Sequence, residues 1–382
     1  MTDRYVDVRP FEPGPPGGEM RGEERIHTAS TTRMMWWALK RHRLAVISGA
    51  FLAILYGSLL ITEFLAPYGV NARHADHLYA PPTRIHLFQE GRFVGPFVYG
   101  TKRERDLEAF RWVYTDDRSR IHRIGLICKG SQTQLWGIVP FNLHLFCARD
   151  GGQIFLMGTD RLGRDLFSRI LYGARISLTI GLLGIAVSFA IALVLGGVAG
   201  YYGGWADSLI QRLIELVRSL PELPLWMALS AAVPVTWPPA AIFLCLTVIL
   251  GLLDWPGLAR AIRSKLLALR EEDFALAARL MGGSPRRIIF RHLLPSFSSH
   301  LIASATLAVP SMILGETALS FLGLGMRAPA TSWGVLLNDA QNLQAIELYP
   351  WLLMPIVPVV LTVLAFNFLG DGLRDAADPY TT

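Results

Sequence analysis

The segment Ala275–Pro295, ALAARLMGGSPRRIIFRHLLP, interrupts a chain whose flanking stretches are apolar enough to cross a membrane. Strong helix formers lead up to Gly282 and Gly283, and glycine ends helices because it readily takes the left-handed conformation of a helix C-terminus. The serine that follows can cap a second helix, and the proline after it suits the first helical position. The pattern therefore predicts a helix over Ala275–Met281, a sharp turn and a second helix.

The composition is that of a polytopic membrane protein. Of the 382 residues, 52% are hydrophobic and only 17% are charged, and the mean hydropathy is +0.37. A soluble protein of this length would carry more charged surface. The net charge of +6 could indicate a nucleic-acid ligand, but the basic residues cluster beside apolar stretches, as in loops kept in the cytoplasm. We expect membrane lipid, and no nucleic acid, around this chain.

Six apolar stretches predict an all-α membrane domain with six transmembrane helices and both termini in the cytoplasm. The first stretch has 19 uncharged residues, enough to cross about 30 Å of hydrocarbon. The cations Lys40, Arg41 and Arg43 precede it and hold the N-terminus inside. The predicted spans are 44–62, 176–206, a third that reaches Val233, 240–261, 301–326 and 351–369.

The third span is the least regular, because Arg212, Glu215, Arg218 and Glu222 recur at helical spacing. We interpret it as a helix that begins at the cytoplasmic interface and turns its charged face toward protein or water. The alternative is an interfacial helix that never crosses the membrane.

The rest of the chain divides by composition. Residues 1–33 are rich in Pro, Gly and charge, which predicts a disordered cytoplasmic tail. Residues 34–66 hold the first transmembrane helix with its basic flank. Residues 67–157 contain strand-like pieces such as RFVGPFVY and predict a small α+β insertion, which lies outside because one span precedes it. Residues 158–382 form a five-helix core with a cytoplasmic loop at about 260–298.

The cysteines and histidines show no metal-ligand spacing, so no metal site is expected. Cys245 lies in an apolar run. Cys128 and Cys147 share the polar insertion, where they either form a disulfide in an oxidising compartment or remain free thiols, and 18 intervening residues leave both open. His74 and His77 are most simply surface residues.

Arg286 and Arg287 stand in the first turn of the second predicted helix, where the helix dipole disfavours cations. Anionic lipid headgroups or an acidic partner surface would favour them. Small residues on the preceding helix would let another surface approach closely. These are Ala275, Ala277, Ala278 and Gly282.

The segment resembles the EAA loop of ABC-importer permeases, a cytoplasmic helix-turn-helix defined by two alanines, a glycine and a later Leu-Pro. Leu276 stands where that motif has Glu, with acids just upstream at 271–273. Docking here should therefore depend on shape, small residues and neighbouring charges more than on that acid. The matching positions are Ala277, Ala278, Gly282, Leu294 and Pro295.

Four further motifs are similar to the C-type permease subunit of oligopeptide and dipeptide importers: GTDRLGRDLFSRILYGARISLTIGL, GYYGGWAD, LGETALSFLGLG and GDGLRDAADPY. The resemblance is close over residues 158–380. It implies a bacterial inner-membrane protein of the type I importer fold, which forms the translocation pathway for peptides or similar solutes with a second, B-type permease subunit. It also implies two ATPase subunits or domains that bind ATP and Mg, and a periplasmic solute-binding protein.

In that family the helix 275–281 would rest on an ATPase domain and act as a lever between inward-open and outward-open states. Gly282, Gly283 and Pro285 would stiffen the lever, with Arg286 and Arg287 beside it. The chain has no GxxxxGK[ST] phosphate loop, so we expect no catalytic residue and no cofactor of its own. The alternative is a membrane-anchored receptor or enzyme that acts through the insertion, which leaves the loop without a purpose.

Polar residues within the spans are candidates for function, because charge is costly in lipid. Glu316 lies centrally in the fifth predicted span, and we favour a structural role in hydrogen bonding a neighbouring helix or the partner permease. No second intramembrane acid or histidine is placed to exchange a proton with it. Arg212 and Glu215 are the other intramembrane polar candidates. An architectural role is expected for the charged residues around the start of the second span: Asp160, Arg161, Arg164, Asp165 and Arg169.

Overall fold

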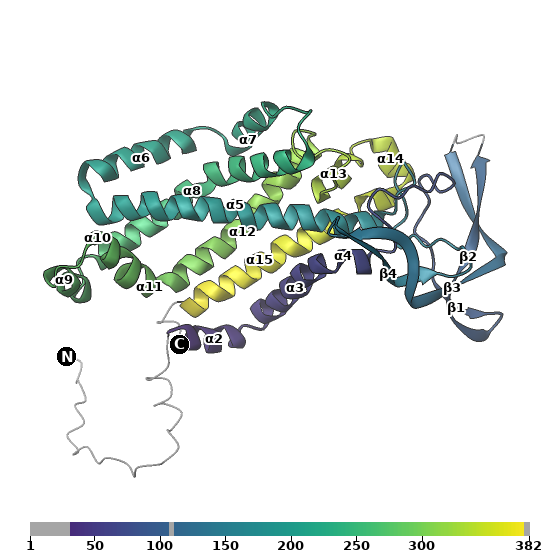
Figure 1. The fold of residues 1–382 in the computed structure, drawn as a ribbon, viewed down its shortest axis with the longest axis horizontal. Coiled ribbons are helices and arrows are strands. Elements are labelled where there is room, and N and C mark those ends of the chain that lie inside the picture. Colours follow the sequence, from purple (N-terminus) through teal and green to yellow (C-terminus); the bar gives the residue numbers. More distant parts are fainter. Residues whose placement is uncertain (1–30, 107–110, 378–382) are drawn as a thin grey trace, which may run out of the picture.

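The computed structural model describes residues 31–106 and 111–377, so most of the tail predicted over 1–33 lies outside the described residues. Within these ranges, five helical segments are long and apolar enough to cross a membrane, and they lie side by side along the long axis of the molecule (Figure 1). They are α3 (Arg43–Leu60), α5 (Leu166–Tyr202), α8 (Pro239–Leu269), α12 (Ser298–Phe321), and the 3₁₀ turn η2 (Pro350–Leu353) followed by α15 (Ile356–Ala377).

Helix α5 is the longest helix and packs along α8. It begins ten residues before the predicted second span, and its 37 residues extend for about 55 Å. Glycines bring the two helices together: a Cβ on Gly196 would lie 2.6 Å from the Ala259 carbonyl oxygen, and one on Gly251 would lie 2.7 Å from the Gly184 carbonyl oxygen. The two backbones are therefore in direct contact, as small residues permit between membrane helices.

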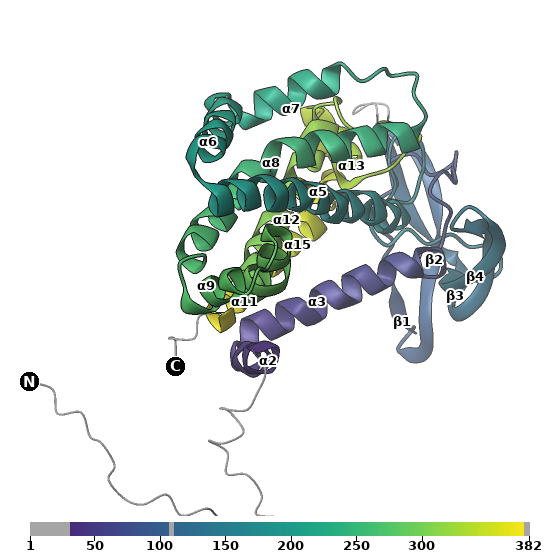
Figure 2. The same ribbon diagram turned by 60° about the vertical axis from the view of Figure 1, so that its left-hand side comes forward.

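The predicted third span is two helices, not one. Helix α6 (Gly204–Ser219) ends before Pro221, and α7 (Glu222–Ala231) begins after it, with Leu220 and Pro221 both extended. Proline has no N–H to continue a helix and disfavours the helical conformation of the residue before it. The pair runs back along the bundle beside α8 (Figures 1 and 2), so a crossing of the membrane by α6 and α7 together remains a prediction.

A short helix precedes the first span. Helix α2 (Thr31–Arg41) lies at an angle to α3, at the same end of the bundle as the last turn of α15 (Figure 1). Lys40 lies over the ring of the exposed Trp36, with 5.2 Å between the ammonium nitrogen and the ring centroid. An aromatic ring beside basic residues is typical of a helix at the membrane surface. The helix begins inside the stretch expected to be tail.

The insertion is a β-domain, so the α+β expectation for it was wrong: the described residues between 67 and 165 form strands and turns but no helix. Aromatic and β-branched residues, which favour strands, are frequent there, and glycine and proline recur between them. The strands form one antiparallel sheet in chain order at the end of the bundle opposite α9 (Figure 1). They are β1 (His86–Gln89), β2 (Arg92–Asp106), β3 (Arg111–Leu135) and β4 (Val139–Ala148).

A charged contact joins the sheet to the helices. After the short helix α4 (Thr62–Leu65), the Glu63 carboxylate accepts hydrogen bonds from the Arg175 guanidinium at 2.8 and 3.0 Å and from the Trp136 backbone N–H at 3.1 Å. Burial by itself raises the pKa of Glu63, but the hydrogen bonds from Arg175 and Trp136 hold that pKa below its ordinary value. The carboxylate therefore remains charged and fixes α4, α5 and the β3–β4 turn to one another.

A buried ion cluster fixes the start of α5. The Asp160 carboxylate accepts from Arg164 Nε at 2.6 Å and from Arg169 Nη1 at 2.5 Å, and Asp339 lies 3.2 Å from the same Arg169 nitrogen. Arg169 is only 1% exposed. Asp339 follows α13 (Trp333–Asn338), so the cluster joins two distant parts of the chain. This geometry supports the architectural role expected for these charges.

We predict that Arg169→Met strongly destabilises the subunit, because it leaves Asp160 and Asp339 with less compensating charge inside the protein. Breaking a buried ion pair costs about 3–5 kcal/mol. The measurement is the midpoint of thermal unfolding of the detergent-solubilised subunit. Arg161→Met is the matched control, since Arg161 is 62% exposed and its Nε lies 3.8 Å from Asp339; equal midpoints for the two variants would contradict the prediction.

Candidate functional site

The predicted helix-turn-helix projects from the end of the bundle opposite the sheet (Figure 1). Helix α9 (Asp273–Leu280) ends two residues before Gly282, whose φ of +77° is the left-handed conformation that glycine favours. The Ser284 hydroxyl accepts a hydrogen bond from the Arg287 N–H at 3.4 Å and caps the second helical segment. That segment consists of α10 (Pro285–Arg287), a π-helical stretch, η1 (Ile288–Leu293), and α11 (Leu294–Ser296).

The alanines of α9 divide between the inside and the outside of this loop. Ala275 and Ala278 are buried in the same apolar cluster as Ile288 and Leu293 of η1. The expectation that all the small residues face a partner was therefore wrong for these two, because they let α9 pack against the loop's own second helix. Ala277 is exposed.

The outer tip of the loop is apolar. Leu280 is 89% exposed and Met281 is 81% exposed, and Gly282 beside them has no atom within 4 Å of where a Cβ would stand. Large apolar side chains at such exposure mark a surface that another protein can cover. We call Ala277, Leu280, Met281 and Gly282 the loop tip.

Basic side chains surround the loop tip and also connect it to the bundle. Arg286 and Arg287 are exposed, as is Pro285, while Leu294 is half-buried and Pro295 exposed at the far end of the loop. On the bundle side, Arg270 Nη1 donates to the Tyr201 carbonyl oxygen at 3.2 Å, near the C-terminus of α5. Each end of the loop is thus joined directly to a long helix, α8 or α12.

Glu316 is fully buried near the C-terminal end of α12 (Ser298–Phe321) and is the centre of a hydrogen-bond network. Its two carboxylate oxygens accept from the Ser177 and Ser320 hydroxyls, each at 2.7 Å. Those hydroxyls in turn accept from backbone N–H groups, of Trp333 at 3.1 Å and of Met326 at 2.9 Å. The network joins α5, α12 and the segment that leads into α13, which favours the structural role.

The remaining charged residues within the predicted spans differ in their surroundings. Arg212 and Glu215 form an exposed ion pair on α6, with 2.9 Å between Nη1 and Oε2. Asp254, in the middle of α8, was missed as a second acid within a span. The signal was present in the sequence, because Asp254 stands alone in the apolar run GLLDWPG.

The sheet domain contains the cysteines and histidines that the sequence offered as a possible disulfide and as surface residues. Cys128 and Cys147 lie on paired strands with their Cα atoms 6.2 Å apart, and the structure joins them by a disulfide. His74 packs against the rings of Tyr68 and Phe155. In the described part of the chain, no group of three or more His, Cys, Asp or Glu side chains is arranged to hold a metal ion.

Comparisons with known proteins identify relatives for both halves of the bundle. Residues 192–382 match the family described as "binding-protein-dependent transport system inner membrane component". Residues 30–82 match the "N-terminal TM domain of oligopeptide transport permease C".

The matched region spans more than two thirds of the length of each of the following relatives. The chain is 43% identical over 226 residues to a dipeptide transport system permease protein of Bacillus subtilis, covering 58% of this chain and 68% of the relative. It is 42% identical over 223 residues to an oligopeptide transport system permease protein of Haemophilus influenzae, with 58% and 69% covered. A glutathione transport system permease protein of Pectobacterium atrosepticum is 39% identical, with 58% and 72% covered.

Among solved structures, the chain is similar to a chain of the MetNI methionine ABC transporter in an inward-facing conformation. The sequence identity is 20% and the TM-score 0.41, over 56% of this chain and 98% of that one.

We predict that Glu316→Leu destabilises the subunit more than Glu316→Gln does, because leucine leaves the Ser177 and Ser320 hydroxyls without their acceptor. Each unsatisfied buried group costs about 1–3 kcal/mol, whereas a glutamine amide can still bond both hydroxyls. The thermal unfolding midpoint in detergent separates the two. Thr306→Val on the same helix is the control, since that hydroxyl bonds only the Ile302 carbonyl one turn earlier, at 2.8 Å. Equal losses for Leu and Gln would argue against the network.

Proposed function

Because the chain belongs to the family of binding-protein-dependent transport system inner membrane components, we propose that it is one of two permease subunits through which an ATP-driven importer moves peptides across the bacterial inner membrane. Its relatives are named as permeases for dipeptides, oligopeptides and glutathione, and these share peptide bonds and charged ends. A related B-type permease would complete the pathway. We place ATP and Mg on two partner ATPase subunits or domains.

The observation that carries this proposal is the projecting loop in a chain of this family. The loop tip offers apolar side chains to a partner at one end of the bundle, and the sheet occupies the other end (Figure 2). Basic residues gather on the loop, at Arg279, Arg286, Arg287 and Arg291. Since cytoplasmic loops carry such an excess of Lys and Arg, we place this end in the cytoplasm with the ATPases.

The same orientation assigns the other parts of the chain to the two sides of the membrane. Helix α2 and the last turn of α15 lie at the loop end and so in the cytoplasm, and the insertion lies in the periplasm. There the sheet can meet a solute-binding protein. This assignment requires that the broken pair α6 and α7 cross the membrane once, as a sixth span.

The loop would transmit movement because its ends join two long helices. Helix α8 leads directly into it and α12 leads out, while Arg270 ties its start to the end of α5. A displacement of α9 by an ATPase domain would therefore move three spans together. Such a stiff element between two packings is what coupling requires. A receptor or enzyme that acts through the insertion would need no such connection, so we do not favour that alternative.

We predict that Ala277→Asp or Met281→Asp in the loop tip uncouples transport. A charge placed on an apolar docking surface costs on the order of 2 kcal/mol or more, which corresponds to a loss of uptake of about tenfold or more. ATP-dependent peptide uptake and solute-stimulated ATPase activity of the assembled complex are the measurements. Gly282→Leu should act in the same direction through the backbone, because leucine is strained at a φ of +77°.

Two controls separate docking from folding of the loop. Glu271→Gln alters an exposed charge that pairs with Arg270 and should leave uptake unchanged. Ala278→Asp places a carboxylate among the buried residues of the loop and should reduce the amount of folded subunit as well as uptake. Normal coupling in Ala277→Asp and Met281→Asp would exclude the loop tip as the docking surface.

We also predict that the Cys128–Cys147 disulfide forms in the periplasm, where thiols are oxidised. The chain has three cysteines in all. Alkylation in denaturant with a reagent that adds mass should therefore modify one cysteine, Cys245, before reduction and all three after it. Three modified cysteines without reductant would contradict both the bond and the periplasmic placement that it supports.

A further inference from the structure

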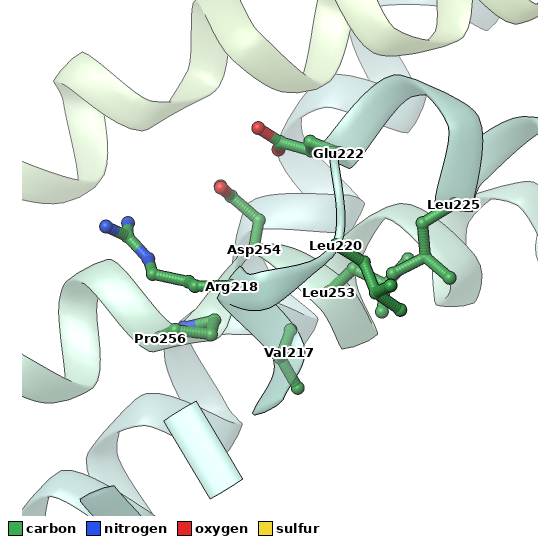
Figure 3. A pocket seen from close by; sticks show the side chains of 8 residues that line it. All are labelled: Val217, Arg218, Leu220, Glu222, Leu225, Leu253, Asp254 and Pro256. Atoms are coloured by element: carbon green, nitrogen blue, oxygen red, sulfur yellow. The ribbon is translucent and has the colours of Figure 1, made fainter. Parts of the chain in front are cut away.

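A cavity of about 330 Å³ lies where α6, α7 and α8 meet (Figure 3). Its size is at the lower end of the range for small-molecule sites. Three charged side chains line it on one side, and leucines line the other. The charged residues are Arg218, Glu222 and Asp254, and the leucines are Leu220, Leu225 and Leu253.

The cavity lies halfway along a membrane span. Asp254 is fifteen residues from each end of α8, which runs from Pro239 to Leu269, so about 22 Å of helix extends on either side of it. Asp254 therefore lies inside the predicted span 240–261, within the hydrocarbon layer. Charged residues there are costly, and they normally face a water-filled path or a partner.

The backbone around the cavity is irregular. Leu220 and Pro221 interrupt the helix between α6 and α7, and Pro256 lies inside α8 and lines the cavity. Proline removes the N–H that would bond the carbonyl of Leu252. Non-helical backbone at membrane depth is tolerated where it is buried in protein or lines a cavity that admits water.

The three charged side chains are not held by direct polar contacts. In residues 31–106 and 111–377, no side-chain hydrogen bond and no ion pair joins Arg218, Glu222 or Asp254 to another residue, and Asp254 interacts with the other two through longer-range electrostatics. By contrast, other charges of α6 are paired, with Arg212 on Glu215 and with Asp207 on Arg263 of α8.

The three charged side chains also point in a common direction at the cavity. In Figure 3 the charged ends of Arg218, Asp254 and Glu222 point to the same side of the cavity. A Cβ on Gly257 would lie 3.1 Å from Arg218 Nη2, so the absence of a side chain there lets the guanidinium rest against α8. Two carboxylates and one guanidinium leave a net negative charge, which favours a cation.

From these observations we propose that the cavity is a solute site in the translocation pathway, and that it binds the free α-ammonium group of a peptide. Asp254 and Glu222 accept hydrogen bonds from the ammonium, Arg218 donates to a carbonyl or carboxylate oxygen of the same peptide, and the leucines contact its apolar side chain. This inference rests on the proposed function, since it names the chemical group that the pathway recognises.

The test is protection of the cavity from alkylation in the assembled importer. Leu220→Cys is introduced with Cys245→Ser, and a water-soluble maleimide is applied in the presence of Ala-Ala or N-acetyl-Ala-Ala. We expect Leu220→Cys to react, and Ala-Ala at about ten times its dissociation constant to slow the reaction about tenfold. N-acetyl-Ala-Ala, which lacks the ammonium, should give little protection, and Asp254→Asn or Glu222→Gln should remove the protection by Ala-Ala.

Matched controls and contrary outcomes make the test decisive. Arg212→Cys, on α6 outside the cavity, should react equally with and without Ala-Ala. The inference is overturned if Leu220→Cys does not react with the maleimide, if both peptides protect it equally, or if Asp254→Asn keeps full protection. Where Asp254→Asn does not assemble, Leu225→Trp fills the cavity without changing its charge and should abolish protection, and full protection in that variant likewise overturns the site.

ATP-dependent uptake of Ala-Ala by the unaltered importer separates this inference from the proposed function. Absence of any peptide uptake rejects the peptide-importer proposal itself. Normal uptake together with an unprotected cavity rejects only the solute site.

Discussion

The contact between α5 and α8 is the constraint on which the rest of the molecule depends. Gly196 and Gly251 bring the two backbones together, and in lipid such close packing, not the hydrophobic effect, holds helices side by side. Helix α5 carries the ion cluster at its start and the contact with Arg270 at its end. Helix α8 carries Asp254 at its centre and runs into the projecting loop. The positions of all these groups follow from one helix pair.

The charged groups have different roles at different positions along the helix bundle. At the sheet end, Arg164 and Arg169 neutralise Asp160 and Asp339 and hold elements in place. Near the C-terminal end of α12, Glu316 accepts hydrogen bonds from two serine hydroxyls within the subunit. Among the residues that the structure describes, the group of Arg218, Glu222 and Asp254 lies beside the middle of α8 with no side-chain hydrogen bond or ion pair. A transport subunit needs both kinds of site, because a pathway residue that is already satisfied cannot bind a solute.

The break between α6 and α7 shows how local chemistry and function coincide. Leu220 and Pro221 cannot continue the helix, and the irregular backbone that results lies beside the cavity. The same break is the point at which the prediction of a single charged helix from sequence periodicity fails. Arg212, Glu215 and Arg218 do share one helix, whereas Glu222 begins the next. The spacing was read correctly over α6 and extended one turn too far.

The sequence by itself determined five of the six predicted membrane spans, the turn at Gly282 and the family, because hydropathy, glycine conformation and ordered motifs are local properties of the chain. It did not determine which side of α9 is free, because only packing against Ile288 and Leu293 buries Ala278 and leaves Ala277 exposed. Nor did it bring Asp254 to Arg218, or Glu316 to Ser177, since those residues meet through helices that are far apart in the chain. Local structure follows from neighbouring residues, whereas the burial and pairing of a side chain depend on which distant part of the chain packs against it.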